Sequence, residues 1–321
     1  MRSARAAGIH GHQHKQHNVG YLAVFATVAI WSTPSLFQFY LNSFYDVWAQ
    51  NFYRYSVACL AIVPFMFYGM RRGGPRLDLR AFLLCLIPCL PNVVHQVTQV
   101  VSLFYMGPGV YAIFNRSSVI MTVLLALAFF PEERFVIRQW QFQAGTALGV
   151  AGAAGVIWFQ EGQEGGHIAL KGVLIAFTAT FCWALYGVLV KRPSARYGSI
   201  RTFGLVSFIT STMLLPLTWA FGNLATPAHV TWQVNSILIV SAISCISVAH
   251  VLYYVAIREL GVALAQTLQL LCPAGAMVLS YFAFGERLTV AQLISAAVLL
   301  FGAFLAMQTK PAATAETAEN L

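Results

Sequence analysis

Ten long apolar runs follow one another along the chain, and short polar segments separate them. They lie at residues 19–42, 46–70, 80–104, 107–130, 136–159, 168–190, 200–222, 235–257, 260–284 and 288–308. Each run reaches the length of about 20 residues that a helix needs to cross a membrane. The runs lack the apolar/polar alternation of barrel strands and are longer than such strands. The pattern therefore predicts an all-α membrane protein with ten transmembrane helices.

Glycine, proline and charged residues mark the ends of most runs. Residues 71–75 (RRGGP), 161–166 (EGQEGG) and 191–193 (KRP) each predict a break between two helices. The first run is longer than the apolar core of a signal peptide and lacks a small-residue cleavage site after it. We therefore interpret it as the first span.

Composition excludes an ordinary soluble domain, because 59% of the 321 residues are hydrophobic and only 9% are charged. Soluble domains carry about 25% charged residues. The net charge of +9 does not indicate nucleic-acid binding, because Lys and Arg occur in short clusters between the apolar runs. With a cytoplasmic N-terminus, only Lys171 and Arg287 lie in outside loops, and Arg54 and Arg116 lie within spans. This bias predicts a multi-pass protein of the inner (plasma) membrane with both termini in the cytoplasm.

The second half of the chain repeats the first. Residues 25–31 (FATVAIW) match residues 177–183 (FTATFCW), and Glu133-Arg134 matches Glu286-Arg287 at nearly the same offset. A repeat of five spans inverts the second copy relative to the first, as in many secondary transporters. We predict a His-rich cytoplasmic tail at 1–18, repeats at 19–159 and 168–308, an outside linker at 160–167 and a second cytoplasmic tail at 309–321.

The repeat ends and the first two spans resemble the drug/metabolite transporter superfamily, in its EamA-like branch. The resemblance rests on residues 29–34 (AIWSTP), 52–55 (FYRY), 130–134 (FPEER) and 284–289 (FGERLT) and extends over about residues 19–308. It implies two inverted five-helix repeats around a central cavity lined largely by spans 1, 3, 4, 6, 8 and 9. It also implies that the halves rock to open that cavity to either side. Family members carry amino acids, other small metabolites, nucleotide sugars or drugs.

A polar stripe runs along the third span, because Asn92, His95, Gln96 and Gln99 follow an i, i+3, i+4, i+7 spacing. Such a stripe faces a cavity or another helix rather than lipid. His250 and Tyr254 form a related pattern in the eighth span. Because no Asp or Glu occupies the middle of a span, His95 and His250 are the candidates for carrying a coupling proton. Alternatively, each is a neutral histidine bonded between helices.

Arg116, beside Asn115 in the fourth span, is a candidate for binding a carboxylate or phosphate of a substrate, or else a structural arginine. For Arg54 we expect bonds to backbone or to a loop. Gln266 and Gln269 of the ninth span are candidates for hydrogen bonding a polar solute, or for interhelical bonds.

Three aromatic residues could line a binding site or simply pack the core: Trp31, Trp183 and Tyr186. Glu133 and Glu286 are candidates for gating, or for helix capping and local ion pairs at the repeat ends. The segment 145–149 (GTALG) fits a close helix contact, within one chain or between the copies of a homodimer.

These features favour a secondary transporter of an amino acid, organic acid or related amphipathic solute, and export is the expected direction. No DDxxD, HExxH or GxSxG motif indicates an enzyme, and no Walker A motif indicates a pump. We expect a small-molecule substrate, a lipid environment and protons or a counter-solute as partners. We expect no cofactor, metal or nucleic acid. A channel or a non-transporting scaffold is the alternative.

Overall fold

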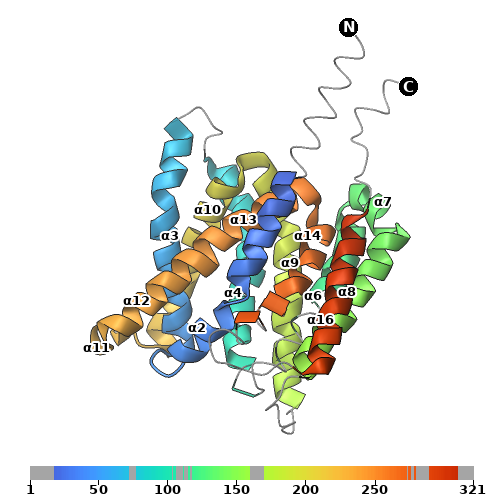
Figure 1. Cartoon of the computed structure of the whole chain (residues 1–321). Helices are drawn as coiled ribbons and strands as arrows, with labels where there is room; N and C mark the ends of the chain where they lie inside the picture. Colours follow the sequence, from blue (N-terminus) through green and yellow to red (C-terminus); the bar gives the residue numbers. More distant parts are fainter. Residues whose placement is uncertain are drawn as a thin grey trace.

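The computed structural model describes residues 18–71, 77–102, 104–105, 111, 115, 118–159, 170–272, 274–275, 278–279 and 289–309. Within these ranges the chain forms helices and no strands, gathered into one bundle (Figure 1). Five of the helices are long and apolar enough to cross a membrane: Leu79–Ser102, Leu170–Tyr197, Ser199–Phe221, Trp232–Leu260 and Val290–Met307. Ten spans remain a prediction from the sequence.

The first half begins with a helix at Asn18–Trp31. The helices α2 (Pro34–Leu41), α3 (Val47–Arg71), α4 (Leu79–Ser102) and α6 (Ser118–Phe129) follow it. A 3-10 turn at Pro131–Glu133 then leads into α7 (Arg134–Ile137) and α8 (Trp140–Trp158).

The second half begins with α9 (Leu170–Tyr197), α10 (Ser199–Phe221) and the short α11 (Thr226–His229). A long helix then comprises α12 (Trp232–Ser241), a π-helical stretch at Ala242–Val248 and α13 (Ala249–Leu260). α14 (Val262–Leu268), a 3-10 turn at Gln269–Leu271 and α16 (Val290–Met307) complete the described chain.

The first predicted span is broken rather than continuous, so the prediction of one helix over 19–42 is wrong. Helix geometry ends at Trp31 and resumes at Pro34. The Ser32 hydroxyl donates to the Val28 carbonyl at 2.8 Å, and the Thr33 hydroxyl donates to the Ile30 carbonyl at 2.7 Å. Because Pro34 has no N–H to donate to the Ile30 carbonyl, that carbonyl accepts the Thr33 N–H at 3.0 Å and the Thr33 hydroxyl instead, and the helix is interrupted there.

The predicted break at 191–193 is also wrong, because α9 continues through Pro193 to Tyr197. The break falls at Gly198, whose φ of 82° is readily adopted only by glycine. α4 likewise contains Pro88 and Pro91 without ending. Membrane helices tolerate interior prolines when neighbouring groups satisfy the freed carbonyls.

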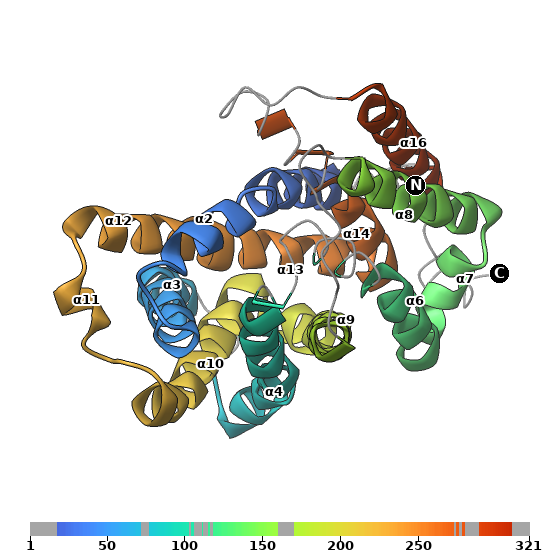
Figure 2. The ribbon, with the colours of Figure 1, turned by 90° about the horizontal axis from the view of Figure 1, so that it is seen from below.

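Helices of the two halves pack against each other throughout the bundle. α4 lies along α9, α3 along α10 and α8 along α16 (Figure 2). The α8–α16 contact is very close, because a Cβ built on Gly302 would lie 2.6 Å from the Gly149 nitrogen and 2.7 Å from the Gly145 oxygen. The small-residue segment at 145–149 thus makes a contact inside one chain, which was one of the two predicted alternatives.

The outside of the bundle is apolar, as a lipid-facing surface must be. Trp158, Trp219 and Trp232 are 73%, 78% and 73% exposed, and each lies at a helix end. Tryptophan favours the boundary between lipid and water at such positions. Tyr21, near the start of the first helix, donates to the Met307 carbonyl at the end of α16, so both described ends lie on one side of the bundle.

Candidate functional site

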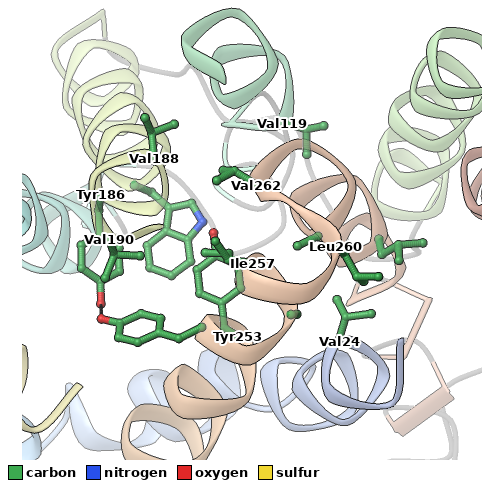
Figure 3. Packing of buried hydrophobic residues seen from close by; sticks show 14 of the residues in the cluster. Val24, Val119, Tyr186, Val188, Val190, Tyr253, Ile257, Leu260 and Val262 are labelled. Carbon is green, nitrogen blue, oxygen red and sulfur yellow. Dashed lines mark hydrogen bonds between the residues drawn. The ribbon is translucent and has the colours of Figure 1, made fainter. Parts of the chain in front are cut away.

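An aromatic cluster lies where helices of both halves meet. Its members are Trp31 from the first half and Trp183, Tyr186, Phe203, Tyr253 and Tyr254 from the second half. The Trp31 and Trp183 ring centroids are 5.3 Å apart, and Trp183 stacks on Tyr253 at 5.7 Å. Figure 3 shows Tyr186 on α9 and Tyr253 on α13 directed into the same region of the core. The predicted aromatic residues are therefore brought together.

The Trp31 indole also anchors the π-helical stretch. Its N–H donates to the Cys245 carbonyl at 2.8 Å. A π-helical turn leaves carbonyls outside the normal ladder, and such turns are frequent at functional sites. The Trp31 bond therefore ties the end of the first helix to an irregular segment of the eighth predicted span.

His95 and His250 adjoin the aromatic cluster, and both contact the Trp183 ring. The centroid of Trp183 lies 5.0 Å from that of His95 and 6.0 Å from that of His250. The Nδ1 atoms lie 2.8 Å from the Ala179 and Ile246 carbonyls, respectively. Because a carbonyl only accepts hydrogen bonds, Nδ1 carries the proton in each neutral ring. His250 Nε2 is buried and has no hydrogen-bond partner among the described residues.

The polar stripe of α4 contacts neighbouring helices. The Asn92 amide donates to the Tyr55 hydroxyl at 3.0 Å and to the Thr210 hydroxyl at 3.1 Å. The Gln96 amide donates to the Tyr55 hydroxyl at 3.0 Å. These bonds join α4 to α3 and α10, which was the predicted alternative to a cavity-facing stripe. The remaining member, Gln99, donates to the Gln38 side chain of α2 at 3.3 Å.

A chain of hydrogen bonds crosses between the halves at Gln266. The Tyr253 hydroxyl donates to the Gln266 carbonyl oxygen at 2.9 Å, and the Gln266 amide donates to the Ser118 hydroxyl at 3.2 Å. Ser118 in turn donates to the Asn115 backbone carbonyl at 2.6 Å. Gln269 is buried within hydrogen-bonding reach of Tyr253. Gln266 thus joins the aromatic cluster to α6, and Gln269 lies beside the same tyrosine.

The hydroxyl groups of Tyr186 and Tyr254 are hydrogen-bonded to each other and join α9 to α13. Ser194 of α9 donates to the Tyr254 backbone carbonyl at 3.5 Å. Both tyrosine side chains are fully buried. Each hydroxyl therefore depends on the other for its hydrogen bond.

Arg54 is 2% exposed, and its Nε and Nη1 atoms have no hydrogen-bond partner among the described residues. For these two atoms, the expected bonds to backbone or loop groups are not found among the described residues. The side chain lies within electrostatic reach of Cys245, Tyr55 and His250. Buried guanidinium nitrogens without hydrogen bonds are costly, which makes Arg54 a candidate for binding an anionic group.

Glu133 lies at the end of the first repeat and is 6% exposed. Its carboxylate accepts the backbone N–H groups of Val262 at 2.9 Å and Ala263 at 3.0 Å, which begin α14. Lys191 of α9 donates to the same carboxylate at 2.5 Å. A negative charge at a helix N-terminus is favourable, because the first N–H groups are free and the helix dipole is positive there.

Two predicted site residues, Arg116 and Glu286, lie outside the described residues. Other residues of the site were missed by sequence reasoning, notably Ser118, Phe203 and Cys245. Nothing in an apolar helical run distinguishes these residues from core. Among the described residues, no group of three or more His, Cys, Asp or Glu side chains is placed to hold a metal ion.

Comparison with known proteins gives one family. The sequence model of the EamA-like transporter family matches residues 18–158 and again residues 170–308. An uncharacterized transporter of Haemophilus influenzae is 21% identical over 238 residues, which cover 74% of this chain and 78% of the relative. A WAT1-related protein of Arabidopsis thaliana is 23% identical, over 80% of this chain and 72% of the relative.

A relative with a named substrate matches a shorter stretch. The threonine/homoserine exporter RhtA of Escherichia coli K12 is 30% identical over 179 residues, or 55% of this chain and 56% of the relative. A solved crystal structure superposes with a TM-score of 0.73 at 18% identity, covering 89% of this chain and 96% of that chain. That likeness shows a shared fold.

Proposed function

Because the chain belongs to the EamA-like transporter family, we propose that it is a secondary transporter that works by alternating access. Its substrate is a small metabolite, namely an amino acid, an organic acid or a related amphipathic solute. The direction is export, which the similarity to a threonine/homoserine exporter supports. The protein lies in the inner membrane with both termini in the cytoplasm.

The aromatic cluster carries this proposal, because both halves contribute to it. Trp31 of the first half contacts Trp183, His250 and Tyr253 of the second at centroid distances of 5.2 to 5.3 Å. Aromatic faces bind the apolar part of a solute, and the adjoining amide and imidazole groups bind its polar part. When two inverted halves rock against each other, a site between them opens to each side in turn.

Substrate counterflow in proteoliposomes tests the proposal. Purified protein is reconstituted with unlabelled solute inside, and uptake of radiolabelled amino acids, organic acids, amines and nucleotide sugars is measured. Acceleration of one class by the same solute on the opposite side is expected from a carrier. A channel would conduct without this acceleration, and a scaffold would transport none of the solutes. Trp183→Ala, checked for folding by size-exclusion chromatography, should abolish the exchange.

A further inference from the structure

We infer that Arg54 binds the carboxylate, and His250 the amino group, of an amphipathic amino acid whose side chain packs on the aromatic cluster. This inference rests on the proposed transport function and specifies the chemistry of its site. It is carried by buried nitrogen atoms of Arg54 and His250 that have no hydrogen-bond partner among the described residues, and by the aromatic cluster around His250.

The first observation is the unpaired cation. Arg54 is the eighth residue of α3, about 10 Å from the helix start at 1.5 Å per residue. Its side chain is 2% exposed, and Nε and Nη1 form no hydrogen bond with the described residues. Arginine donors present a fixed fork that matches the two oxygens of a carboxylate.

The acidic side chains that the structure describes near helix ends are already engaged. Glu133 binds Lys191, and Glu259 binds Arg258. Asp46, two turns before Arg54, accepts the N–H groups of Trp48 and Ala49 at 2.9 Å. These three carboxylates, in the described part of the chain, are therefore bonded to groups other than Arg54. The Arg54 guanidinium can then bind the carboxylate of a solute.

The second observation is an unpaired acceptor close to this cation. His250 donates through Nδ1 to the Ile246 carbonyl, so its Nε2 carries a lone pair and no proton. That nitrogen is buried without a hydrogen-bond partner among the described residues, and His250 is within electrostatic reach of Arg54. A donor fork and a single acceptor fit the carboxylate and the ammonium of an amino acid.

The third observation is what surrounds the pair. The His250 ring lies between Trp31, at a centroid distance of 5.2 Å, and Phe203, on which it stacks at 5.4 Å. Arg54 lies on α3, which packs against the π-helical stretch that contains Cys245, and the Cys245 carbonyl accepts the Trp31 indole N–H. The polar groups therefore border aromatic faces, which favours an amino acid with an apolar side chain over a highly polar one.

The test is a competition series on wild-type protein in proteoliposomes. L-phenylalanine is compared with L-phenylalaninamide, which lacks the carboxylate, and with 3-phenylpropionate, which lacks the amino group. We expect L-phenylalanine to exchange and each analogue to compete at least tenfold less well. Equal competition by the amide would overturn the role of the carboxylate. Equal competition by 3-phenylpropionate would overturn the role of the amino group.

Variants of Arg54 then test whether this residue binds the carboxylate of the substrate. Truncating one member of a buried charge pair costs about 2 kcal/mol or more, so Arg54→Gln should raise the half-saturating concentration of L-phenylalanine at least about 30-fold. It should also remove the preference for the acid over the amide, which a merely structural arginine would not do. Arg54→Lys should keep a part of that preference. The exposed Arg258→Gln is the matched control, and it should leave both values unchanged.

The outcomes separate the inference from the proposed function. Exchange of amines or sugars but not of amino acids would leave a carrier and overturn the inference. Folded Arg54→Gln protein with the wild-type acid preference would do the same. Absence of exchange for every solute in the panel would overturn the proposed function itself, and the inference with it.

Discussion

Glu133 and Val262 lie 129 positions apart in the chain, yet the carboxylate of the first accepts the backbone N–H of the second at 2.9 Å. The bond joins the end of the first repeat to the start of α14 in the second. With Lys191 on the same carboxylate, three helical segments are tied at one end of the bundle.

Replacing Glu133 should weaken the junction in a graded way. Glu133→Gln keeps an acceptor oxygen but loses the charge, and Glu133→Ala loses both. We expect thermal unfolding midpoints in the order wild type, Gln variant, Ala variant, with the Ala variant losing about 1–2 kcal/mol of stability. The control is Glu259→Gln, because the ion pair that Glu259 forms in the described part of the chain is with its neighbour Arg258, whose side chain is 37% exposed. An unchanged midpoint for Glu133→Ala would contradict the capping role.

Trp183 should govern substrate affinity, because it contacts Trp31, His95, Tyr186, His250 and Tyr253. In Trp183→Phe a ring remains, so we expect a moderate rise in the half-saturating concentration, whereas Trp183→Ala should abolish saturable exchange. The control is Trp219→Ala, because Trp219 is 78% exposed on the outside of the bundle. Equal losses in Trp219→Ala would mean that the effect comes from general destabilisation.

His250 and His95 offer a matched pair for testing proton coupling. Both Nδ1 atoms are bonded to carbonyls, and the buried Nε2 of His250 lacks a partner among the described residues. If protons drive transport, His250→Gln should lose stimulation by an imposed pH gradient, even at substrate concentrations high enough to saturate its weakened counterflow. His95→Gln should keep that stimulation. Gradient-driven transport by His250→Gln equal to wild type would exclude His250 as the proton carrier.

The α8–α16 contact should be intolerant of larger side chains. A Cβ on Gly302 would lie 2.6 Å from a backbone nitrogen of α8, so Gly302→Leu must push the two helices apart. Overpacking of this kind costs about 1–3 kcal/mol or more. We expect a lower unfolding midpoint, measured by fluorescence-detected size-exclusion chromatography after heating. Ala147→Leu on the exposed face of α8 is the control and should behave as wild type.

The orientation can be checked independently of transport. Because Lys and Arg are concentrated on one side, a green fluorescent protein fused after residue 321 should fluoresce, and an alkaline phosphatase fused there should be inactive. A phosphatase inserted at 163 should be active. Active phosphatase at the C-terminus would reverse the proposed topology.

Hydropathy and repetition by themselves predicted the class of the protein, and the resemblance of a few short motifs predicted its family. Apolar runs, the inverted repeat and residues such as Glu133-Arg134 and Trp31 predicted an EamA-like transporter, and the family is confirmed. The apolar runs can be recognised from the sequence alone, because the lipid around a membrane helix requires an apolar composition. The break at Pro34 and the continuity of α9 through Pro193 were not visible, since both depend on neighbouring bonds and on Gly198.

Only the tertiary structure decided which polar side chains are already satisfied. Asn92 and Arg54 are both polar residues within apolar runs, and the sequence does not distinguish their roles. In the folded chain Asn92 is bonded to Tyr55 and Thr210, whereas the Nε and Nη1 atoms of Arg54 have no hydrogen-bond partner among the described residues. The hydrogen-bond partners of a buried side chain lie on helices that are distant in sequence. Helix packing brings these partners within reach, so the sequence alone does not show them.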